Sequence, residues 1–175
     1  MTQTFLISSR FSDTARCLDS KRLNKQITEA FQIYKYLIGR GKMQGNPHPY
    51  NMWRGYEKAL LFYILAMHDE WKARYDNEQR GGKRTHLSGR EAESYVLNTD
   101  FKDYKEPKWI RDHRVLSSHR AALLYKNPEY YKQFGWKEKP AKPIKVNKDG
   151  SVSLPYFWPD KNKKEPILEN SEDNQ

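Results

Sequence analysis

Apolar residues between Leu18 and Gly39 recur at steps of three and four, which is the spacing of one face of an α-helix. Ser12 or Asp13 is a suitable cap for the start of this first helix, and Gly39 with Gly41 would end it. The positions that form the apolar stripe are Leu23, Ile27, Ala30, Phe31, Tyr34, Leu37 and Ile38. The pattern therefore predicts a long amphipathic helix near the N-terminus.

Further along the chain the pattern predicts three more helices. Residues 50–75 are apolar almost all round in their middle, so this helix is expected to be the central buried element. A short helix is expected over 91–97, and a longer one over 111–126 that ends before a proline.

Few segments resemble strands, so the sequence predicts a mostly α fold. We expect a single compact helical domain over residues 1–160. It would have an extended N-terminal segment, MTQTFLIS, and an extended C-terminal wrap that contains the apolar sequence LPYFWP. Residues 161–175 are polar and are expected to form a disordered tail.

Four polar residues form a narrow strip beside the apolar stripe of the first helix: Asp19, Arg22, Gln26 and Glu29. Two interpretations are open. The residues could pair with one another at an exposed surface, where such pairs contribute little to stability. Alternatively, the strip could line a cleft in which an arginine and a carboxylate face a substrate.

The charge of the chain indicates an anionic partner. There are 32 Lys and Arg residues against 22 Asp and Glu residues, which gives a formal charge of +10 and a pI near 9.5. Nucleic acid is the commonest such partner, with duplex DNA expected, and an anionic membrane is a distant second. The longest apolar run is too short to cross a bilayer, and no signal peptide precedes it, so a cytoplasmic protein is expected. No stable protein partner can be inferred.

The sequence gives no indication of a metal or a cofactor. A single cysteine excludes an internal disulfide framework and a Cys-rich zinc site, and the five histidines form no compact ligand pair. His48 and Trp53, in NPHPYNMW, are candidates for a pocket wall. His119 and Arg120 adjoin an apolar helical face and are candidates for substrate or phosphate binding.

Two further segments are candidates for contact with nucleic acid. The connector NEQRGGKRTHLSGR is basic, and Arg84 is its representative candidate. The segment KNPEYYKQFGW, residues 126–136, gathers aromatic and basic side chains. It would either close the domain by packing or offer a platform for stacked bases and phosphates. Its candidate residues are Tyr130, Tyr131, Lys132 and Trp136.

The N-terminus is a further candidate, as a nucleophile. Thr2 is small enough to allow removal of the initiator methionine. A free α-amine has a pKa of about 7.7–8.0, so it is partly neutral near physiological pH. A neutral amine can attack an electrophilic sugar carbon and form a Schiff base.

Several of these features together resemble the pyrimidine-dimer DNA glycosylases, the endonuclease V-type repair enzymes, and most closely their phage and bacterial relatives. The resemblance comprises Met1-Thr2 with a short extended start, a long first helix with Arg22, and PEYYKQFG over residues 128–135. It extends to LDSKRLNKQ, NPHPYNMWRGYE, SSHRAALLYKNPEYY and LPYFWP.

The resemblance implies a helical enzyme whose N-terminal amine attacks the deoxyribose carbon that carries the base. Thr2 matches the nucleophile and Arg22 matches a substrate-binding arginine. The family places its catalytic glutamate directly after that arginine, where this chain has Leu23. Glu29 or Asp19 would therefore supply the carboxylate, and we favour Glu29 because it is embedded among Gln26, Ala30 and Ile33. The family also has arginine after the threonine, where this chain has Gln3.

Two hypotheses follow. In the first, the protein is a DNA N-glycosylase, with or without abasic-site lyase activity, that acts on damaged or modified pyrimidines through Thr2, Glu29 and Arg22. In the second, it is a non-catalytic nucleic-acid-binding accessory protein that keeps the fold.

Overall fold

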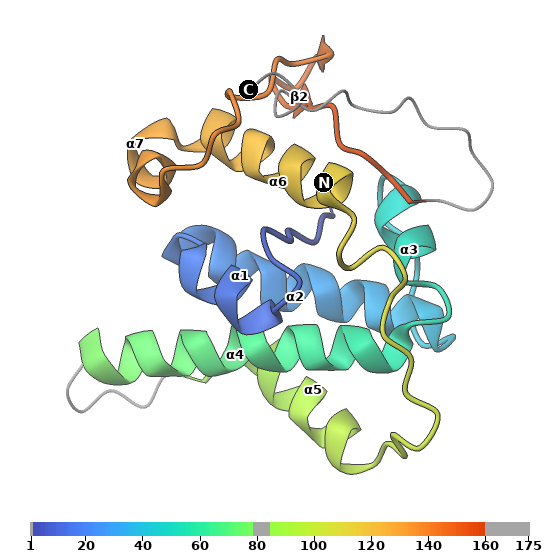
Figure 1. Ribbon diagram of the computed structural model, residues 1–175. Coiled ribbons are helices and arrows are strands. Elements are labelled where there is room, and N and C mark those ends of the chain that lie inside the picture. The colour runs from blue at the N-terminus through green and yellow to red at the C-terminus, as the bar shows by residue number, and fades with distance from the viewer. Residues whose placement is uncertain (1, 79–84, 160–175) are drawn as a thin grey trace. The chain divides into compact units, whose positions relative to one another are not determined.

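The described portion of the chain is almost entirely helical. The computed structural model describes residues 2–78 and 85–159, with the backbone alone for 76–78. These residues contain seven α-helices, one 3-10 helix and one two-stranded hairpin (Figure 1). The prediction of a mostly α fold is confirmed. The predicted tail, 161–175, lies outside the described residues.

The chain divides into two compact units. Unit 1 comprises residues up to Phe5 together with Arg10–Pro107, and unit 2 comprises Leu6–Ser9 together with the chain from Lys108 onward. The prediction that residues 1–160 form one domain stays a prediction. The helices of unit 1 are α1 Phe11–Cys17, α2 Ser20–Leu37, α3 His48–Trp53, α4 Glu57–Glu78 and α5 Leu87–Leu97. The elements of unit 2 are α6 His113–Lys126, α7 Pro128–Tyr131, η1 Lys132–Phe134, β1 Lys145–Val146 and β2 Val152–Ser153.

The N-terminal helical region is two helices, so the prediction of one continuous helix was wrong. The break lies at Leu18, which is extended with ψ of 136° and fully buried. Asp19 is also extended and is the N-cap of α2, because its carboxylate accepts a hydrogen bond from the backbone N–H of Arg22. The cap supplies a partner for an amide that a new helix leaves unsatisfied. The predicted end of the helix is correct: Gly39 follows with φ of +76°.

The predicted helix over 50–75 is likewise divided, into α3 and α4. Gly55 separates them with φ of +85°, a conformation that favours glycine. The backbone N–H of Tyr56 donates to the carbonyl of Trp53 at 2.8 Å, which closes the turn. As expected, α4 is the central helix of unit 1, and it packs against α1, α2 and α5 (Figure 1).

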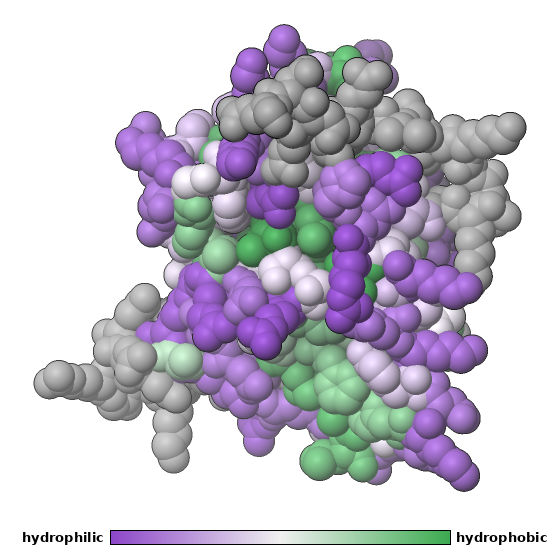
Figure 2. Space-filling model, in the orientation of Figure 1, coloured by the Kyte–Doolittle hydropathy of each residue, from purple (hydrophilic) through white to green (hydrophobic). Residues whose placement is uncertain are grey.

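The core of unit 1 is built on α2 and α4. Its fully buried side chains include Leu23, Ile27, Ile33, Leu60 and Tyr63. Apolar side chains also reach the surface over α5 and the loop that follows it (Figure 2). Leu97 is 86% exposed there. No helix among residues 2–78 and 85–159 is long and apolar enough to cross a membrane.

Unit 2 is built around α6. The C-terminal segment that contains LPYFWP packs its apolar side chains there, with Leu154, Phe157 and Trp158 buried. The backbone N–H of Phe157 donates to Ser118 Oγ on α6 at 3.0 Å. The apolar wrap expected from the sequence is therefore present.

Candidate active site at the N-terminal segment

The extended residues that follow Thr2 are held by side chains of α2. The N–H of Gln3 donates to Glu29 Oε2 at 3.0 Å. Gln26 binds the same segment with both ends of its amide: Nε2 donates to the carbonyl of Gln3 at 2.9 Å, and Oε1 accepts from the N–H of Phe5 at 2.8 Å. Gln26 thus makes bonds of the kind that a neighbouring β-strand would make.

Two aromatic residues complete this arrangement from α3 and α4. The Tyr63 hydroxyl lies 2.7 Å from the carbonyl of Phe5, and Trp53 Nε1 donates to Thr4 Oγ1 at 2.9 Å. Thr2 is buried, and its hydroxyl lies 3.4 Å from the carbonyl of Gln44. The segment that carries the candidate nucleophile therefore has a fixed path within unit 1.

Glu29 is a buried carboxylate with few charged neighbours. Its side chain is 10% exposed, and Lys25 Nζ lies 3.5 Å from Oε1. Burial raises the pKa of Glu29, because the charged form loses hydration, while the Gln3 amide and the Lys25 ammonium act in the opposite direction. A carboxyl group with a raised pKa is suited to proton transfer near neutral pH.

The N-terminal end of the polar strip is formed by Asp19, which is buried, and Arg22, which is partly exposed. Arg22 Nη1 lies 3.1 Å from Asp19 Oδ1, and the Arg22 side chain is 20% exposed. Asp19 already caps α2 through the backbone of Arg22. Asp19 therefore contacts both the backbone and the guanidinium of Arg22, and a guanidinium has more N–H donors than this pair uses.

The other candidates of unit 1 lie elsewhere. His48 is half-buried at the start of α3, and its N–H donates to Asn46 Oδ1 at 3.0 Å. Arg84 lies outside the described residues. No group of three or more metal-binding side chains is present among the residues that were described.

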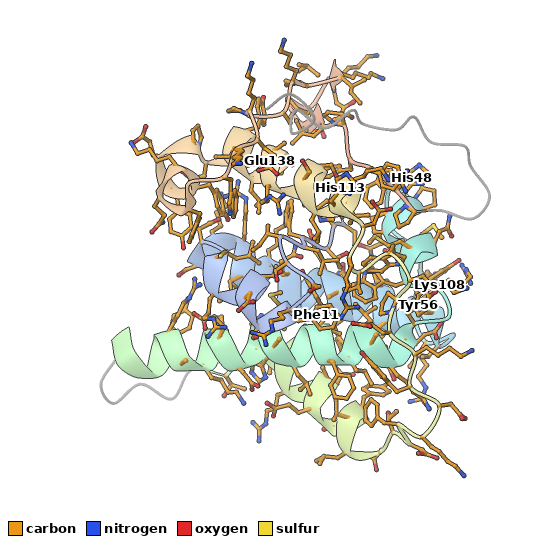
Figure 3. All side chains as sticks on the ribbon, in the orientation of Figure 1. Phe11, His48, Tyr56, Lys108, His113 and Glu138 are labelled. Atoms are coloured by element: carbon orange, nitrogen blue, oxygen red, sulfur yellow. The ribbon has the colours of Figure 1, made fainter. Side chains whose placement is uncertain are left out.

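In unit 2, His119 and Arg120 bind the continuation of the N-terminal segment. His119 Nδ1 accepts from the N–H of Leu6 at 2.9 Å, and Arg120 Nη1 donates to the carbonyl of Ile7 at 3.2 Å. Complete burial lowers the pKa of His119 to about 3, so the imidazole is neutral. Arg120 also pairs with Glu138, which is labelled in Figure 3, through an Nε–Oε1 contact of 2.8 Å.

The aromatic cluster after α6 combines packing with partial exposure. Tyr131 is fully buried, and its ring stacks on Trp136 at a centroid distance of 5.7 Å. Tyr130 and Trp136 are half-buried, and Lys132 is exposed and pairs with Glu129 at 2.7 Å. The buried Tyr131 fits the interpretation that this segment closes the domain by packing. The more exposed Tyr130, Lys132 and Trp136 fit a platform for bases and phosphates.

Burial separates the predicted site residues into two sets. Four of the predicted substrate contacts have almost no surface to offer, because their side chains are enclosed by the protein: Gln26, Trp53, His119 and Tyr131. These side chains bind backbone groups or pack in the core, and their role as substrate contacts stays a prediction. The other substrate-binding candidates within the described residues keep some exposed surface: Asp19, His48, Arg120, Tyr130, Lys132 and Trp136.

Tyr63 was not predicted as a site residue, although a signal was available. A tyrosine within the apolar run ALLFYILAM must find a partner for its hydroxyl when it is buried. The partner is the carbonyl of Phe5, from a distant region of the sequence.

One family model matches the N-terminal part of the chain. Residues 2–81, a little under half of the chain, match the model of a family described as pyrimidine dimer DNA glycosylase. No curated protein and no solved structure gives a significant match. The matched range contains Thr2, Arg22 and Glu29, and it ends before unit 2 resumes at Lys108.

Proposed function

Because residues 2–81 carry the sequence pattern of the pyrimidine dimer DNA glycosylase family, we propose that this protein is a DNA N-glycosylase. Its substrate would be a damaged or modified pyrimidine in duplex DNA. The activity would take place in the cytoplasm of a bacterial or phage-infected cell. The net charge of +10 supports binding to the phosphate backbone.

One observation carries the proposed mechanism: Glu29 accepts a hydrogen bond from the N–H of Gln3, the residue after Thr2. One residue of extended chain spans about 3.5 Å, so the Thr2 nitrogen belongs to the immediate surroundings of this carboxylate. Removal of Met1 would turn that nitrogen into a primary amine. The nucleophile and a proton acceptor would then be neighbours, as covalent catalysis requires.

The reaction we propose begins with attack of the neutral Thr2 amine on C1′ of the damaged nucleotide. A bond forms between the amine nitrogen and C1′, and the bond from C1′ to the base breaks. The base leaves with the electron pair and takes up a proton, while Glu29 accepts the proton that the amine loses. The anionic form of Glu29 would also stabilise the positive charge that develops on the sugar.

Strand cleavage would follow once the sugar ring opens. The C1′–O4′ bond breaks, O4′ takes the proton that Glu29 accepted, and the nitrogen lone pair forms the C1′=N bond of a protonated imine. Glu29 is then a carboxylate again. A base removes a proton from C2′, and the phosphate at C3′ departs with the electron pair of its C–O bond. Glu29 is the candidate base for this step as well. Lyase activity therefore belongs to the proposal, and Arg22 is its candidate for holding a phosphate.

Glu29→Gln tests the carboxylate, because it keeps the size of the side chain and an oxygen that can accept from Gln3. Base release from duplex DNA that contains a pyrimidine dimer should fall by about 10² or more, with DNA binding retained. Asp19→Asn is the matched control: it removes a carboxylate from the same strip but keeps the helix cap. Full activity of Glu29→Gln together with loss in Asp19→Asn would assign the role to Asp19.

The amine is tested separately by borohydride trapping on DNA with an abasic site, after the N-terminal residue has been identified by mass spectrometry. A covalent adduct on Thr2 is expected. A chain with extra residues before Thr2 should give no adduct, because its Thr2 nitrogen is an amide. Equal base release by the extended and the processed chains would refute the amine mechanism.

A second candidate function is supported by one departure from the family. Leu23 occupies the position after Arg22 where the family has glutamate, and it is fully buried in the core of unit 1. A protein that lost its catalytic carboxylate would be a nucleic-acid-binding accessory protein. DNA binding without base release from dimer-containing, abasic or modified DNA would establish this alternative.

A further inference from the structure

A small, well-formed β-hairpin lies in unit 2, in a region of the chain that the family match does not reach. β1 and β2 pair antiparallel, with Val146 opposite Val152. The turn is closed by the Gly150 N–H, which donates to the carbonyl of Asn147 at 3.0 Å. Gly150 has φ of +80°, as expected for a type I turn followed by a left-handed residue.

Polar side chains reinforce this turn. Asp149 Oδ1 accepts from the N–H of Ser151 at 3.0 Å and from its hydroxyl at 2.6 Å. Asn147 Nδ2 donates to Ser151 Oγ at 2.9 Å. An isolated hairpin is only marginally stable in water, so these bonds matter for keeping its shape.

Both ends of the hairpin are attached to α6. Before β1, the N–H of Ala141 donates to the carbonyl of Ala121 on α6 at 2.9 Å. After β2, Leu154 is buried and Phe157 is hydrogen-bonded to Ser118. Figure 1 shows the hairpin projecting away from α6 between these attachments. The hairpin is thus presented on a rigid base.

The hairpin exposes two large aliphatic side chains close together in the sequence. Ile144 is 71% exposed and Val146 is 66% exposed. Val146 lies in β1, and Ile144 directly precedes this strand, where its N–H donates to the carbonyl of Ser153 at 2.8 Å. Both exposed side chains therefore belong to the paired part of the hairpin. Lys142, Lys145 and Lys148 are exposed within and beside the hairpin.

The charge of unit 2 identifies the kind of partner. Residues 108–159 carry 11 Lys and Arg residues against four Asp and Glu residues. The described residues of unit 1 between 10 and 107 are nearly balanced, with 15 against 13. The excess positive charge of the described chain therefore belongs mainly to the unit that bears the hairpin. A polyanion is the complementary partner.

We infer that the β1–β2 hairpin is a DNA contact in which Ile144 and Val146 enter a groove of the duplex while the lysines around them bind phosphates. This inference rests on the proposed function, since it requires DNA as the partner. Aliphatic side chains that enter the minor groove can separate neighbouring base pairs and kink the duplex. Such a wedge would lower the cost of moving a nucleotide out of the stack, which chemistry at C1′ requires.

The test compares full-length variants in binding to one duplex over a range of salt concentrations. Ile144→Thr combined with Val146→Thr keeps β-branched side chains but removes the apolar character. Lys145→Gln removes one charge. Leu97→Thr and Lys102→Gln are matched controls, because Leu97 is 86% exposed and Lys102 lies in an acidic loop of unit 1.

The threonine pair should weaken binding about tenfold with an unchanged salt slope, and it should abolish the rise in fluorescence of a 2-aminopurine at the kinked step. Lys145→Gln should instead reduce the slope of log K against log salt by about 0.9, the value for one phosphate contact. Both controls should resemble the wild type. Circular dichroism would verify that each variant is folded.

Three results would contradict the inference, and each has a different meaning. Wild-type protein that binds no duplex DNA would refute the proposed function and this inference together. Wild-type binding that the hairpin variants leave unchanged would refute the inference alone. If the threonine pair loses binding to vesicles of anionic phosphatidylserine but keeps its binding to DNA, the hairpin is a membrane contact and the inference is wrong.

Discussion

Lowering the pH should destabilise unit 2 through a single residue, His119. The imidazole is fully buried and accepts the Leu6 N–H at Nδ1, so a proton on that nitrogen would replace an acceptor with a donor. Burial lowers the pKa of His119 to about 3, against 6.5 in the unfolded chain. Between these values the unfolded state binds more protons than the folded state, so stability falls as the pH falls.

The size of the effect follows from this difference in pKa. At pH 8 the His119 imidazole is neutral in both the folded and the unfolded state, so it leaves the free energy of unfolding almost unchanged. At pH 5 the imidazole is almost fully protonated in the unfolded chain but neutral in the folded protein. This difference lowers the free energy of unfolding by about 2 kcal/mol. The loss begins near pH 6.5 and continues until the pH reaches about 3.

His119→Asn supplies the comparison, because the asparagine Oδ1 occupies a place similar to that of Nδ1 and does not titrate. Urea unfolding of both proteins would be followed at pH 8, 7, 6 and 5 by the NMR signals of α6 amides. The wild type should lose about 2 kcal/mol more than the variant between pH 8 and pH 5. His68 and His86, whose pKa values burial also lowers, contribute equally to both proteins.

Equal losses in the two proteins would refute the reasoning. His119 would then be protonated in the folded state or exposed to water, and its bond to Leu6 could not hold as described. His119→Asn also changes the free energy of unfolding at pH 8. That change does not affect the test, because the test compares only how much stability each protein loses between pH 8 and pH 5.

The remaining predictions concern stability and DNA binding. Gly89→Ala should lower stability by about 1–3 kcal/mol in thermal unfolding, because its Cβ would lie 2.5 Å from the buried His68 ring; an unchanged melting temperature would contradict this packing. Asp19→Ala should cost about 1 kcal/mol in urea unfolding, because the Arg22 N–H loses its cap, whereas Asp19→Asn should cost little. Lys132→Ala should reduce the salt slope of DNA binding by about one unit with stability unchanged, and a slope equal to that of the wild type would exclude a phosphate contact there.

The sequence identified the main helices because their apolar positions are periodic. This holds for α2, whose stripe residues Leu23, Ile27 and Ala30 are buried, whereas α4 was predicted from a run that is apolar almost all round. The breaks at Leu18 and Gly55 were missed because apolar spacing continues through them, although Asp19 and Gly55 were visible signals of a cap and a turn. Local hydrogen bonding decided those boundaries, and periodicity does not report it.

The candidate site was only partly predictable. Arg22 and Glu29 were identified as members of one strip, because helical spacing alone places them on the same side of α2. Their partners were not predictable. Gln26 binds the backbone of residues 3 and 5, and a backbone group leaves no mark in the sequence.

The polar strip provides hydrogen-bond partners for the backbone of the extended N-terminal segment. An extended chain outside a sheet has N–H and C=O groups without partners, and burying them unpaired costs about 1–3 kcal/mol each. Gln26 and Glu29 satisfy three such groups, on Gln3 and Phe5, and Tyr63 lies within hydrogen-bond distance of a fourth. Leucine at position 26 would fill the space but leave two of these groups unpaired. The strip is therefore polar because its side chains bind backbone groups. The same contacts fix the position of Gln3, the residue next to Thr2. The nucleophile that we propose, the Thr2 amine, belongs to the main chain, so a helix that positions it needs side chains that bind backbone groups.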